Sequence, residues 1–340
     1  MTDTLVAGTR LAERYEIEDV IGRGRSPVYR ARDTRLGRAV AVKEVGLVAA
    51  AADDPASADR SRALREARAA ARVHAPGVVQ VYDVVEEHTA VWLVMELVRA
   101  PSLQRRVAEQ GPMDEVTAAR LGLGLLDALD AAHAQGVVHR DVRPANVLVA
   151  DPDDPTVEVP VRLADFGLAA LRDDTALAAP GALSGSPAFT APEQVTGGPS
   201  GPATDLWALG AVLYFAVEGT APFAGDSPAA VSAAVVAGDV RPAERAGRLA
   251  RIAEMLLATD PARRPGAPRV RAALRAVATG SEPGDDTQEA PAAGAAAPAP
   301  AIAAVPTAAT AAPGAVGDRT PPAGSPGANA PAGAPGALDP

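Results

Sequence analysis

The amino-acid sequence predicts an α+β fold with a small β-rich lobe, a larger helical lobe and a disordered C-terminal tail. Short strand-like runs separated by turn residues occupy the first hundred residues, whereas helical spacing dominates after Pro101. Strands and helices in separate runs are typical of α+β proteins, and ligands often bind where two such lobes meet. Residues 281–340 are almost entirely Ala, Pro and Gly, so they have little to bury and are expected to be disordered.

Five β-strands are predicted in the first lobe. A glycine-bearing turn from Gly22 to Pro27 joins the first two strands as a hairpin. Residues 46–60 read as a polar, Ala-rich linker, and residues 61–73 have a helical composition, with strong helix formers and no Gly or Pro. The predicted strands are Tyr15–Ile21, Val28–Ala31, Arg38–Val45, Val78–Val85 and Val91–Met95.

The second lobe is predicted to begin with a long amphipathic helix over residues 114–135. Gly136 suits the C-cap of this helix, because glycine adopts positive φ without strain. The apolar positions that recur at helical spacing are Leu121, Leu125, Leu129 and Ala132. The later predicted elements are two short strands, Val147–Val149 and Val161–Leu163, and the helices Asp205–Val217, Pro228–Val236, Leu249–Ala258 and Val270–Ala278.

Composition and charge exclude several classes of protein. The chain has no cysteine, which excludes disulfides and thiolate metal sites. The formal net charge of −10 argues against nucleic acid as the main partner. No signal peptide is apparent, and the uncharged run from Pro291 to Gly317 is rejected as a membrane span because prolines interrupt its weakly apolar alanines. We therefore expect a cytoplasmic protein.

Lys43 is the only lysine among the 32 lysines and arginines of the chain. A compact ammonium cannot be exchanged freely for a planar guanidinium. A lysine that is retained in a chain whose other basic residues are arginine suggests chemistry that needs a point charge, such as binding a phosphate. The alternative is chance, because one stray lysine has to fall somewhere.

Three motifs in the second lobe carry a resemblance to a known family. They are His139 to Asn146 (HRDVRPAN), Asp165-Phe166-Gly167 and Ala191-Pro192-Glu193. In this order the chain resembles the eukaryotic-like (Hanks-type) serine/threonine protein kinases of bacteria over about residues 13–278. The resemblance implies a bilobal protein kinase fold, with an N-lobe at about 13–97, a C-lobe at about 98–278 and a disordered tail over 279–340.

The resemblance also assigns the groups that carry the chemistry, with ATP and Mg²⁺ as cofactors. Asp141 would accept or orient the proton of the incoming hydroxyl, and Asn146 and Asp165 would bind Mg²⁺ through hard oxygen atoms. Lys43 would hold the α- and β-phosphates. Glu66 would pair with Lys43 and fix the position of its ammonium group. Alternatively, Glu66 lies on a solvated helix face beside neighbouring arginines.

The same resemblance predicts an apolar adenine pocket. Met95 takes the gatekeeper position, Glu96 and Val98 the hinge, and Gly22 and Gly24 belong to the glycine-rich phosphate loop. The residues expected to cover the two faces of the base are Ile21, Val28 and Ala41 on one side and Leu148 on the other. On composition alone, core packing is the better interpretation for each residue of this set.

Other matches point to serine/threonine substrates and to regulation. Pro144 and the segment Gly185-Ser186-Pro187 resemble the serine/threonine class rather than the tyrosine class. Arg140 precedes the catalytic aspartate, which in this family implies control by phosphorylation of the activation loop. The candidate acceptors are Thr175 and Ser184, whose alternative is ordinary polar loop residues.

Three further residues are predicted to be structural. His139 is expected to be hydrogen-bonded in the interior rather than to act as a base. Asp205 would brace the catalytic loop or cap its helix, and the two roles are compatible. Arg264 would form an ion pair with Glu193.

The chain departs from the family pattern at two places. Pro27 stands where a third glycine is expected, the loop is one residue short, and proline has no N–H to offer a phosphate. Arg143, expected near the γ-phosphate as a catalytic residue, replaces the usual lysine; this keeps the charge but changes the shape. These departures leave a pseudokinase or scaffold module as an alternative to an active enzyme, and a small-molecule phosphotransferase fits less well. We expect protein substrates, no nucleic acid and no membrane span in this chain, and the resemblance also allows a homodimer.

Overall fold

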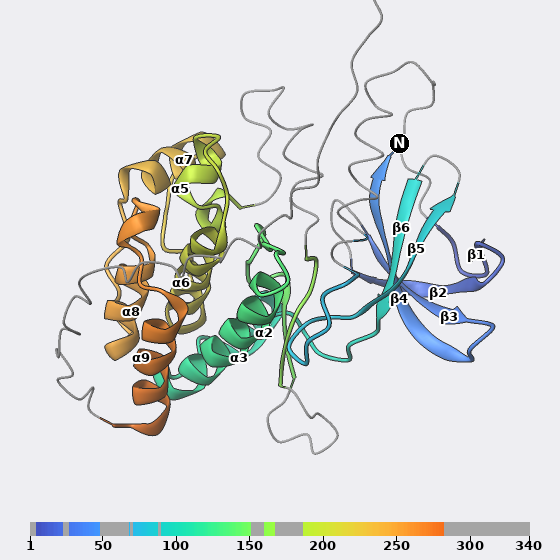
Figure 1. The fold of residues 1–340 in the computed structure, drawn as a ribbon, viewed down its shortest axis with the longest axis horizontal. Helices are drawn as coiled ribbons and strands as arrows, with labels where there is room; N and C mark the ends of the chain where they lie inside the picture. Colours follow the sequence, from blue (N-terminus) through green and yellow to red (C-terminus); the bar gives the residue numbers. More distant parts are fainter. Residues whose placement is uncertain are drawn as a thin grey trace, which may run out of the picture. The chain divides into compact units, whose positions relative to one another are not determined.

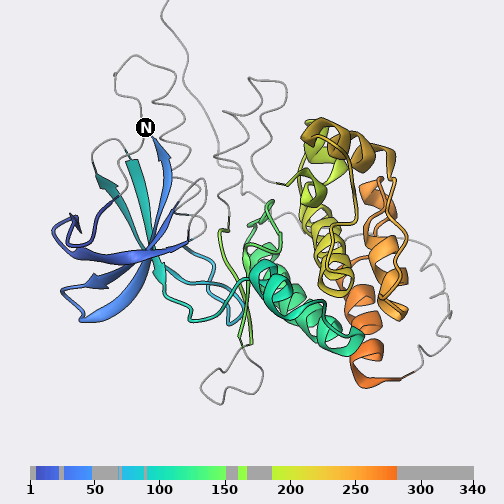
Figure 2. The same cartoon turned by 180° about the vertical axis from the view of Figure 1, so that it is seen from behind.

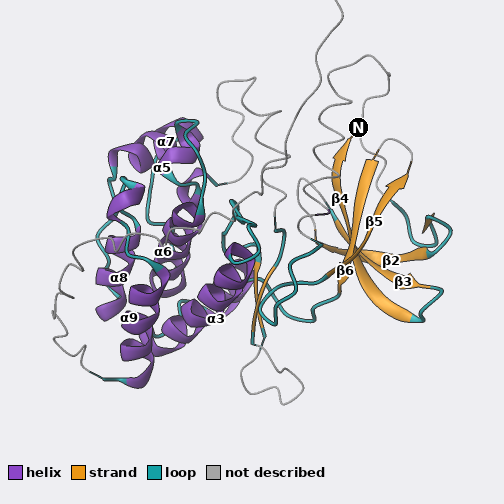
Figure 3. Ribbon diagram, viewed as in Figure 1, coloured by secondary structure: helices purple, strands orange, loops and turns teal. Residues whose placement is uncertain are grey.

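The structure is a computed structural model that describes residues 5–22, 27–47, 68, 71–87, 90–150, 160–166 and 186–281. All of these residues belong to one compact unit, Met1–Asp286. Within this unit a β-rich lobe precedes a helical lobe, as Figures 1 and 3 show, and the view from behind in Figure 2 agrees. The α+β prediction is confirmed. The predicted tail from residue 282 onward and most of the helix predicted over residues 61–73 lie outside the described residues. Thr279, predicted as the first residue of the tail, is the last residue of a helix instead.

Six antiparallel strands form the sheet of the first lobe, in the order β1-β2-β3-β4-β6-β5. All five predicted strands are present. The fourth begins at Val81 rather than Val78, which instead makes an isolated bridge to Leu163 in the second lobe. The two-residue strand β1 was not predicted, because two residues are too few to show an alternation. The bounds are β1 Arg10–Leu11, β2 Tyr15–Gly22, β3 Val28–Asp33, β4 Arg38–Leu47, β5 Val81–Glu87 and β6 Ala90–Glu96.

The two faces of this sheet bury different sets of side chains. Successive side chains of a strand point to opposite faces. On β4, Val40 and Val42 therefore join one core cluster with Tyr29 and Trp92, whereas Ala41 joins a second cluster. Lys43 shares the face of Ala41 by this alternation, and it lies opposite Val28 on β3 and Leu93 on β6. The alternation thus places the lone lysine on the face that bears the second cluster.

The helical lobe contains the four later helices that were predicted, with ends shifted by up to three residues. It also contains α2, which was not predicted as a separate helix. The bounds are α2 Leu103–Gln110, α3 Glu115–His133, β7 Val147–Val149, β8 Val161–Leu163, η1 Pro187–Phe189, α5 Pro192–Val195, α6 Pro202–Glu218, α7 Pro228–Ala237, α8 Arg248–Leu256, η2 Pro261–Arg263 and α9 Ala267–Thr279.

Helix α3 forms where it was predicted, but its C-terminus differs. Asp114 is the N-cap, and its Oδ1 accepts a hydrogen bond from the Thr117 N–H at 2.9 Å. The C-cap is Ala134, so the prediction that Gly136 caps the helix is wrong. Gly136 lies two residues farther on, at φ 74°, where the chain turns away. The predicted apolar positions Leu121, Leu125, Leu129 and Ala132 are all buried.

Helix α6 lies at the centre of this lobe and is buried along nearly its whole length. A Cβ atom on Gly210 would lie 2.7 Å from Leu256 Cβ, so glycine allows α6 and α8 to approach closely. Trp207 stacks on Phe223 with ring centroids 5.5 Å apart. Among the helices that the structure describes, none combines the length and apolar character needed to cross a membrane.

Candidate active site

The segment from His139 to Asn146, called the catalytic loop below, is anchored to helix α6 by one buried carboxylate. Asp205 accepts the backbone N–H of His139 at 2.8 Å through Oδ2 and that of Arg140 at 2.8 Å through Oδ1. His133 of α3 approaches Oδ2 as well, at 2.7 Å. The bracing role predicted for Asp205 is confirmed. Its alternative role as N-cap is wrong, because α6 begins at Pro202 and Gly201 occupies the cap.

His139 is a buried structural histidine, as predicted. Its Nδ1 accepts the N–H of Asp141 at 3.2 Å, so the ring proton lies on Nε2, which donates to the Ala164 carbonyl at 2.9 Å. The ring also packs edge-on against Phe166, with centroids 4.4 Å apart. His139 therefore joins the catalytic loop to the segment that carries Asp165.

Asp141 and Asn146 are held together by the amide of Asn146. The Nδ2 group of Asn146 donates to the Asp141 carbonyl at 2.8 Å and to Asp141 Oδ2 at 3.1 Å. Arg143 Nε lies 3.7 Å from Asp141 Oδ1, and this Nε has no hydrogen-bond partner within the described part of the chain. The Asn146 carbonyl accepts the N–H of Ala164, next to Asp165. The predicted catalytic and metal-binding groups therefore lie along one connected stretch.

Lys43 contacts Asp165 directly, which the sequence did not predict. The Nζ atom lies 2.5 Å from Asp165 Oδ2, and the two side chains are 7% and 10% exposed. Asp165 has a positive φ of 68°. Glu66, the partner predicted for Lys43, lies outside the described residues, so that pair stays a prediction.

Most of the residues predicted to line the adenine pocket gather in one cluster between the lobes. Ala41 and Met95 are buried at its centre, and Val28, Val98 and Leu148 pack against it. Their association in space agrees with the prediction, and their contact with a base stays a prediction. The cluster combines strands β3, β4 and β6 with β7 of the other lobe, so it includes both of the predicted faces.

Two other residues predicted at the nucleotide behave differently. Ile21 is 45% exposed and is not part of this cluster. Glu96 directs its side chain towards Arg162, with Oε2 3.4 Å from Arg162 Nη1, and donates its N–H to the Gln80 carbonyl at 2.8 Å.

The glycine-rich turn and the proposed phosphorylation sites are only partly described. Gly22 ends β2 and pairs with Val28, and a Cβ atom there would lie 3.3 Å from Val28 Cβ. Gly24, Thr175 and Ser184 lie outside the described residues, so their roles stay predictions.

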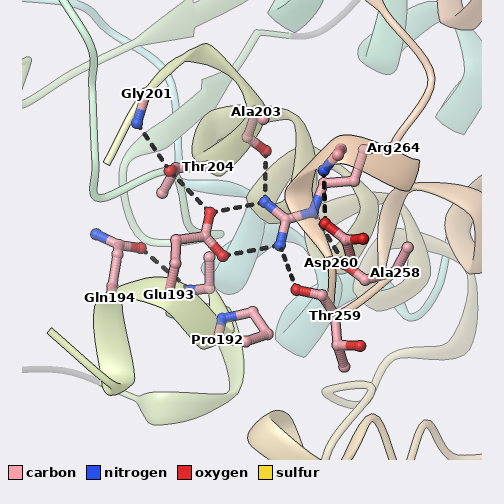
Figure 4. Close-up of polar contacts among 12 residues, drawn as sticks. Pro192, Glu193, Gln194, Gly201, Ala203, Thr204, Ala258, Thr259, Asp260 and Arg264 are labelled. Carbon is pink, nitrogen blue, oxygen red and sulfur yellow. Dashed lines mark hydrogen bonds and ion pairs between the residues drawn. The ribbon is translucent and has the colours of Figure 1, made fainter. Parts of the chain in front are cut away.

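The predicted ion pair between Glu193 and Arg264 is confirmed (Figure 4). Arg264 Nη1 and Nη2 contact Glu193 Oε1 and Oε2 at 2.7 and 2.8 Å, and the Arg264 side chain is fully buried. The remaining guanidinium donors reach the carbonyls of Ala203, Ala258 and Thr259. Burial is the largest single influence on the pKa of Glu193 and raises it, but the hydrogen bonds from Arg264, the backbone and Thr204 and the charge of Arg264 together outweigh burial, so the pKa is lowered overall.

Sequence reasoning missed Gln194. Its Nε2 donates to the Arg140 carbonyl at 2.9 Å, and its Oε1 accepts the N–H of Ala191 at 3.1 Å. This side chain links the segment that carries Glu193 to the catalytic loop. The only signal in the sequence was its position directly after the third motif.

Comparison with known proteins shows the family to which the chain is similar. A family model described as a protein kinase domain matches residues 15–273. The serine/threonine-protein kinase PkaA of Streptomyces coelicolor is 35% identical over 283 residues, which are 79% of this chain and 51% of PkaA. The DNA damage-responsive serine/threonine-protein kinase RqkA of Deinococcus radiodurans is 41% identical over 67% of this chain and 33% of RqkA. PknB of Mycobacterium leprae is 38% identical over 65% of this chain and 35% of PknB.

The chain belongs to the protein kinase family. Its relatives place it among the eukaryotic-like serine/threonine kinases of bacteria. A crystal structure of Rad53 residues 1–466 in complex with AMP-PNP shares the fold, with a TM-score of 0.61 and 24% identity over 76% of this chain and 64% of that one. The chain spans about half the length of PkaA and about a third of PknB and RqkA.

Proposed function

We propose that this chain is an active serine/threonine protein kinase that transfers the γ-phosphoryl group of ATP to hydroxyl groups of protein substrates. The observation that supports this proposal is a connected set of contacts. It runs from Asp141 through Asn146 and Ala164 to the neighbourhood of Asp165 and Lys43. Phosphoryl transfer depends mainly on alignment and charge stabilisation, and this set supplies both kinds of group. The proposed kinase domain covers residues 13–278, with lobes at 13–97 and 98–278.

Asp141 is the proposed base of this reaction. Its carboxylate is oriented by Asn146 and by Arg143, and the loop that carries it is held by the buried Asp205. The carboxylate accepts or orients the proton of the incoming hydroxyl as that oxygen attacks the γ-phosphorus. Arg143 offers a positive charge beside the transferred group.

Asn146 and Asp165 fit Mg²⁺. Both offer hard oxygen ligands, and the two hydrogen bonds from Asn146 Nδ2 to Asp141 direct the amide oxygen away from that residue. The bound ion would neutralise charge on the phosphates. Lys43 is the proposed ligand of the α- and β-phosphates, with Glu66 as its proposed support. The pocket around Ala41 and Met95 is proposed for the adenine.

Regulation through the activation loop belongs to the same proposal, with Thr175 and Ser184 as acceptors. The Nε atom of Arg140 is buried and has no hydrogen-bond partner in the described part of the chain, which supports a role in binding a phosphate. The proposed substrates are proteins. A homodimer and the absence of nucleic-acid binding stay predictions.

The test is incubation of the purified chain with labelled Mg-ATP, alone and with a general protein substrate. Label on the wild type but not on Asp141→Asn is the expected result. Binding of ATP without transfer of label in either form would overturn the proposal in favour of a pseudokinase.

A further inference from the structure

A cavity of about 400 Å³ lies beside the catalytic loop. Four segments that are far apart in the sequence form its wall: helix α2, the catalytic loop, the short helix η1 and the end of α6. Gln104 comes from α2, Arg143 and Ala145 from the loop, Phe189 from η1 and Phe215 from α6. None of the roles assigned above uses this cavity as a whole.

The cavity lies within reach of the proposed chemistry. Arg143, on its wall, has Nε 3.7 Å from Oδ1 of Asp141, the proposed base. An extended peptide advances about 3.3 Å per residue. A peptide whose hydroxyl reaches Asp141 would therefore present a side chain to the cavity from a position within about three residues of that hydroxyl.

The lining of the cavity is apolar on one side. Phe189 and Phe215 meet nearly edge to face, with centroids 6.0 Å apart and planes at 79°, and both pack against the core of the helical lobe. Ala145 and Ala221 add small apolar surfaces. The transfer of an apolar side chain from water to this side of the cavity is therefore favourable.

The charge of the lining excludes another class of side chain. Among the described residues of the lining, Arg143 is the only charged one, and no carboxylate is present. A lysine or arginine that entered would lose water, find no carboxylate among the described residues of the lining and approach the like charge of Arg143.

We propose that this cavity selects the acceptor peptide by taking an aliphatic or aromatic side chain within about three residues of the phosphorylated serine or threonine, and that it rejects lysine and arginine. The proposal rests on the proposed kinase function, because it takes the bound peptide to be phosphorylated. Peptide binding, however, needs no turnover and can be measured separately.

The experiment compares peptides that differ only by Leu or Arg at each position around a central serine. The full chain phosphorylates them with Mg-ATP as the wild type and as Phe215→Glu and Gln104→Glu, each of which places a carboxylate in the lining. Gln110→Glu is the matched control, because it makes the same substitution on α2 at an exposed residue that does not line the cavity.

At one position the wild type is expected to favour Leu over Arg in kcat/KM by on the order of tenfold. Phe215→Glu should invert this preference, and Gln104→Glu should reduce it severalfold, whereas Gln110→Glu should leave it unchanged. If thermal unfolding shows that Phe215→Glu does not fold, the exposed Gln104 position carries the test. Equal use of Leu and Arg by the wild type, or identical profiles for Gln104→Glu and Gln110→Glu, would overturn the proposal.

A second measurement separates this proposal from the kinase function. Fluorescence anisotropy with the same peptides, labelled and without ATP, reports binding alone. A Leu preference in binding that Gln104→Glu weakens, without any phosphorylation, would support the cavity and overturn the kinase function. Equal binding of the Leu and Arg peptides, together with normal autophosphorylation, would overturn the cavity and leave the kinase function intact.

Discussion

Lys43 Nζ lies 2.5 Å from Asp165 Oδ2, although the two residues are 122 positions apart in the chain. Each charge neutralises the other at a place that is nearly closed to water. A phosphate that binds Lys43 and a cation that binds Asp165 must both compete with this pair. The two binding events should therefore assist one another.

Lys43→Arg should lower kcat/KM for phosphorylation by more than tenfold, or roughly 1.4 kcal/mol of transition-state stabilisation. The larger planar guanidinium does not fit a site that encloses a compact ammonium. Steady-state kinetics with ATP and a peptide would measure the loss. Arg30→Lys is the control, since Arg30 forms an exposed pair with Asp19 on the same sheet and its change should leave the rate within about twofold. Normal phosphorylation by Lys43→Arg would contradict the role given to the lone lysine.

Removal of Mg²⁺ should weaken nucleotide binding in the wild type by more than about tenfold, because Lys43 then stays paired with Asp165 and the phosphates must compete with that pair. In Asp165→Asn the lysine no longer faces a charged partner, so the dependence on Mg²⁺ should fall to within about threefold. Isothermal titration of ADP with and without Mg²⁺ measures both values. An equal dependence in the two proteins would show that the pair does not couple metal and nucleotide.

Arg264→Met should destabilise the fold by about 3–5 kcal/mol, because it leaves the carboxylate of Glu193 buried without its partner. The exposed pair of Arg105 and Glu109 on α2 supplies the control, since Arg105→Met should change stability by less than about 0.5 kcal/mol. Urea denaturation gives both free energies of unfolding. An effect at Arg264 as small as that at Arg105 would contradict the importance given to this buried pair.

Asp33 should make stability depend on pH in the acid range. Hydrogen bonds from Arg14 lower the pKa of this buried carboxyl to about 2, although burial alone would raise it. Since the folded pKa is below the unfolded value, the contribution is fully present above about pH 4 and is lost as the pH falls towards 2. Asp33→Asn should therefore be less stable than the wild type at pH 6, and the difference should shrink steadily between pH 4 and pH 2. Urea midpoints across this range provide the check, and a constant difference would contradict the assignment.

Local pattern was enough to predict most elements of the fold. The strands of the first lobe and helix α3 show their period within a few residues, and β7 and β8 were predicted with their observed bounds. Helix ends were less certain: Ala134 rather than Gly136 caps α3, because the final turn depends on local hydrogen bonds that composition does not reveal.

The motifs around Asp141 and Asp165 lie on continuous stretches of chain and keep their spacing whatever the fold does, so the residues proposed to carry the chemistry could be predicted from the sequence alone. Which of these groups touch could be seen only once the elements were packed together. The contact of Lys43 with Asp165, the link from Gln194 to the Arg140 carbonyl and the cavity beside Arg143 each join segments separated by tens of residues or more. Such contacts arise from the packing of whole elements against one another, which the periodicity of residues along the chain does not predict.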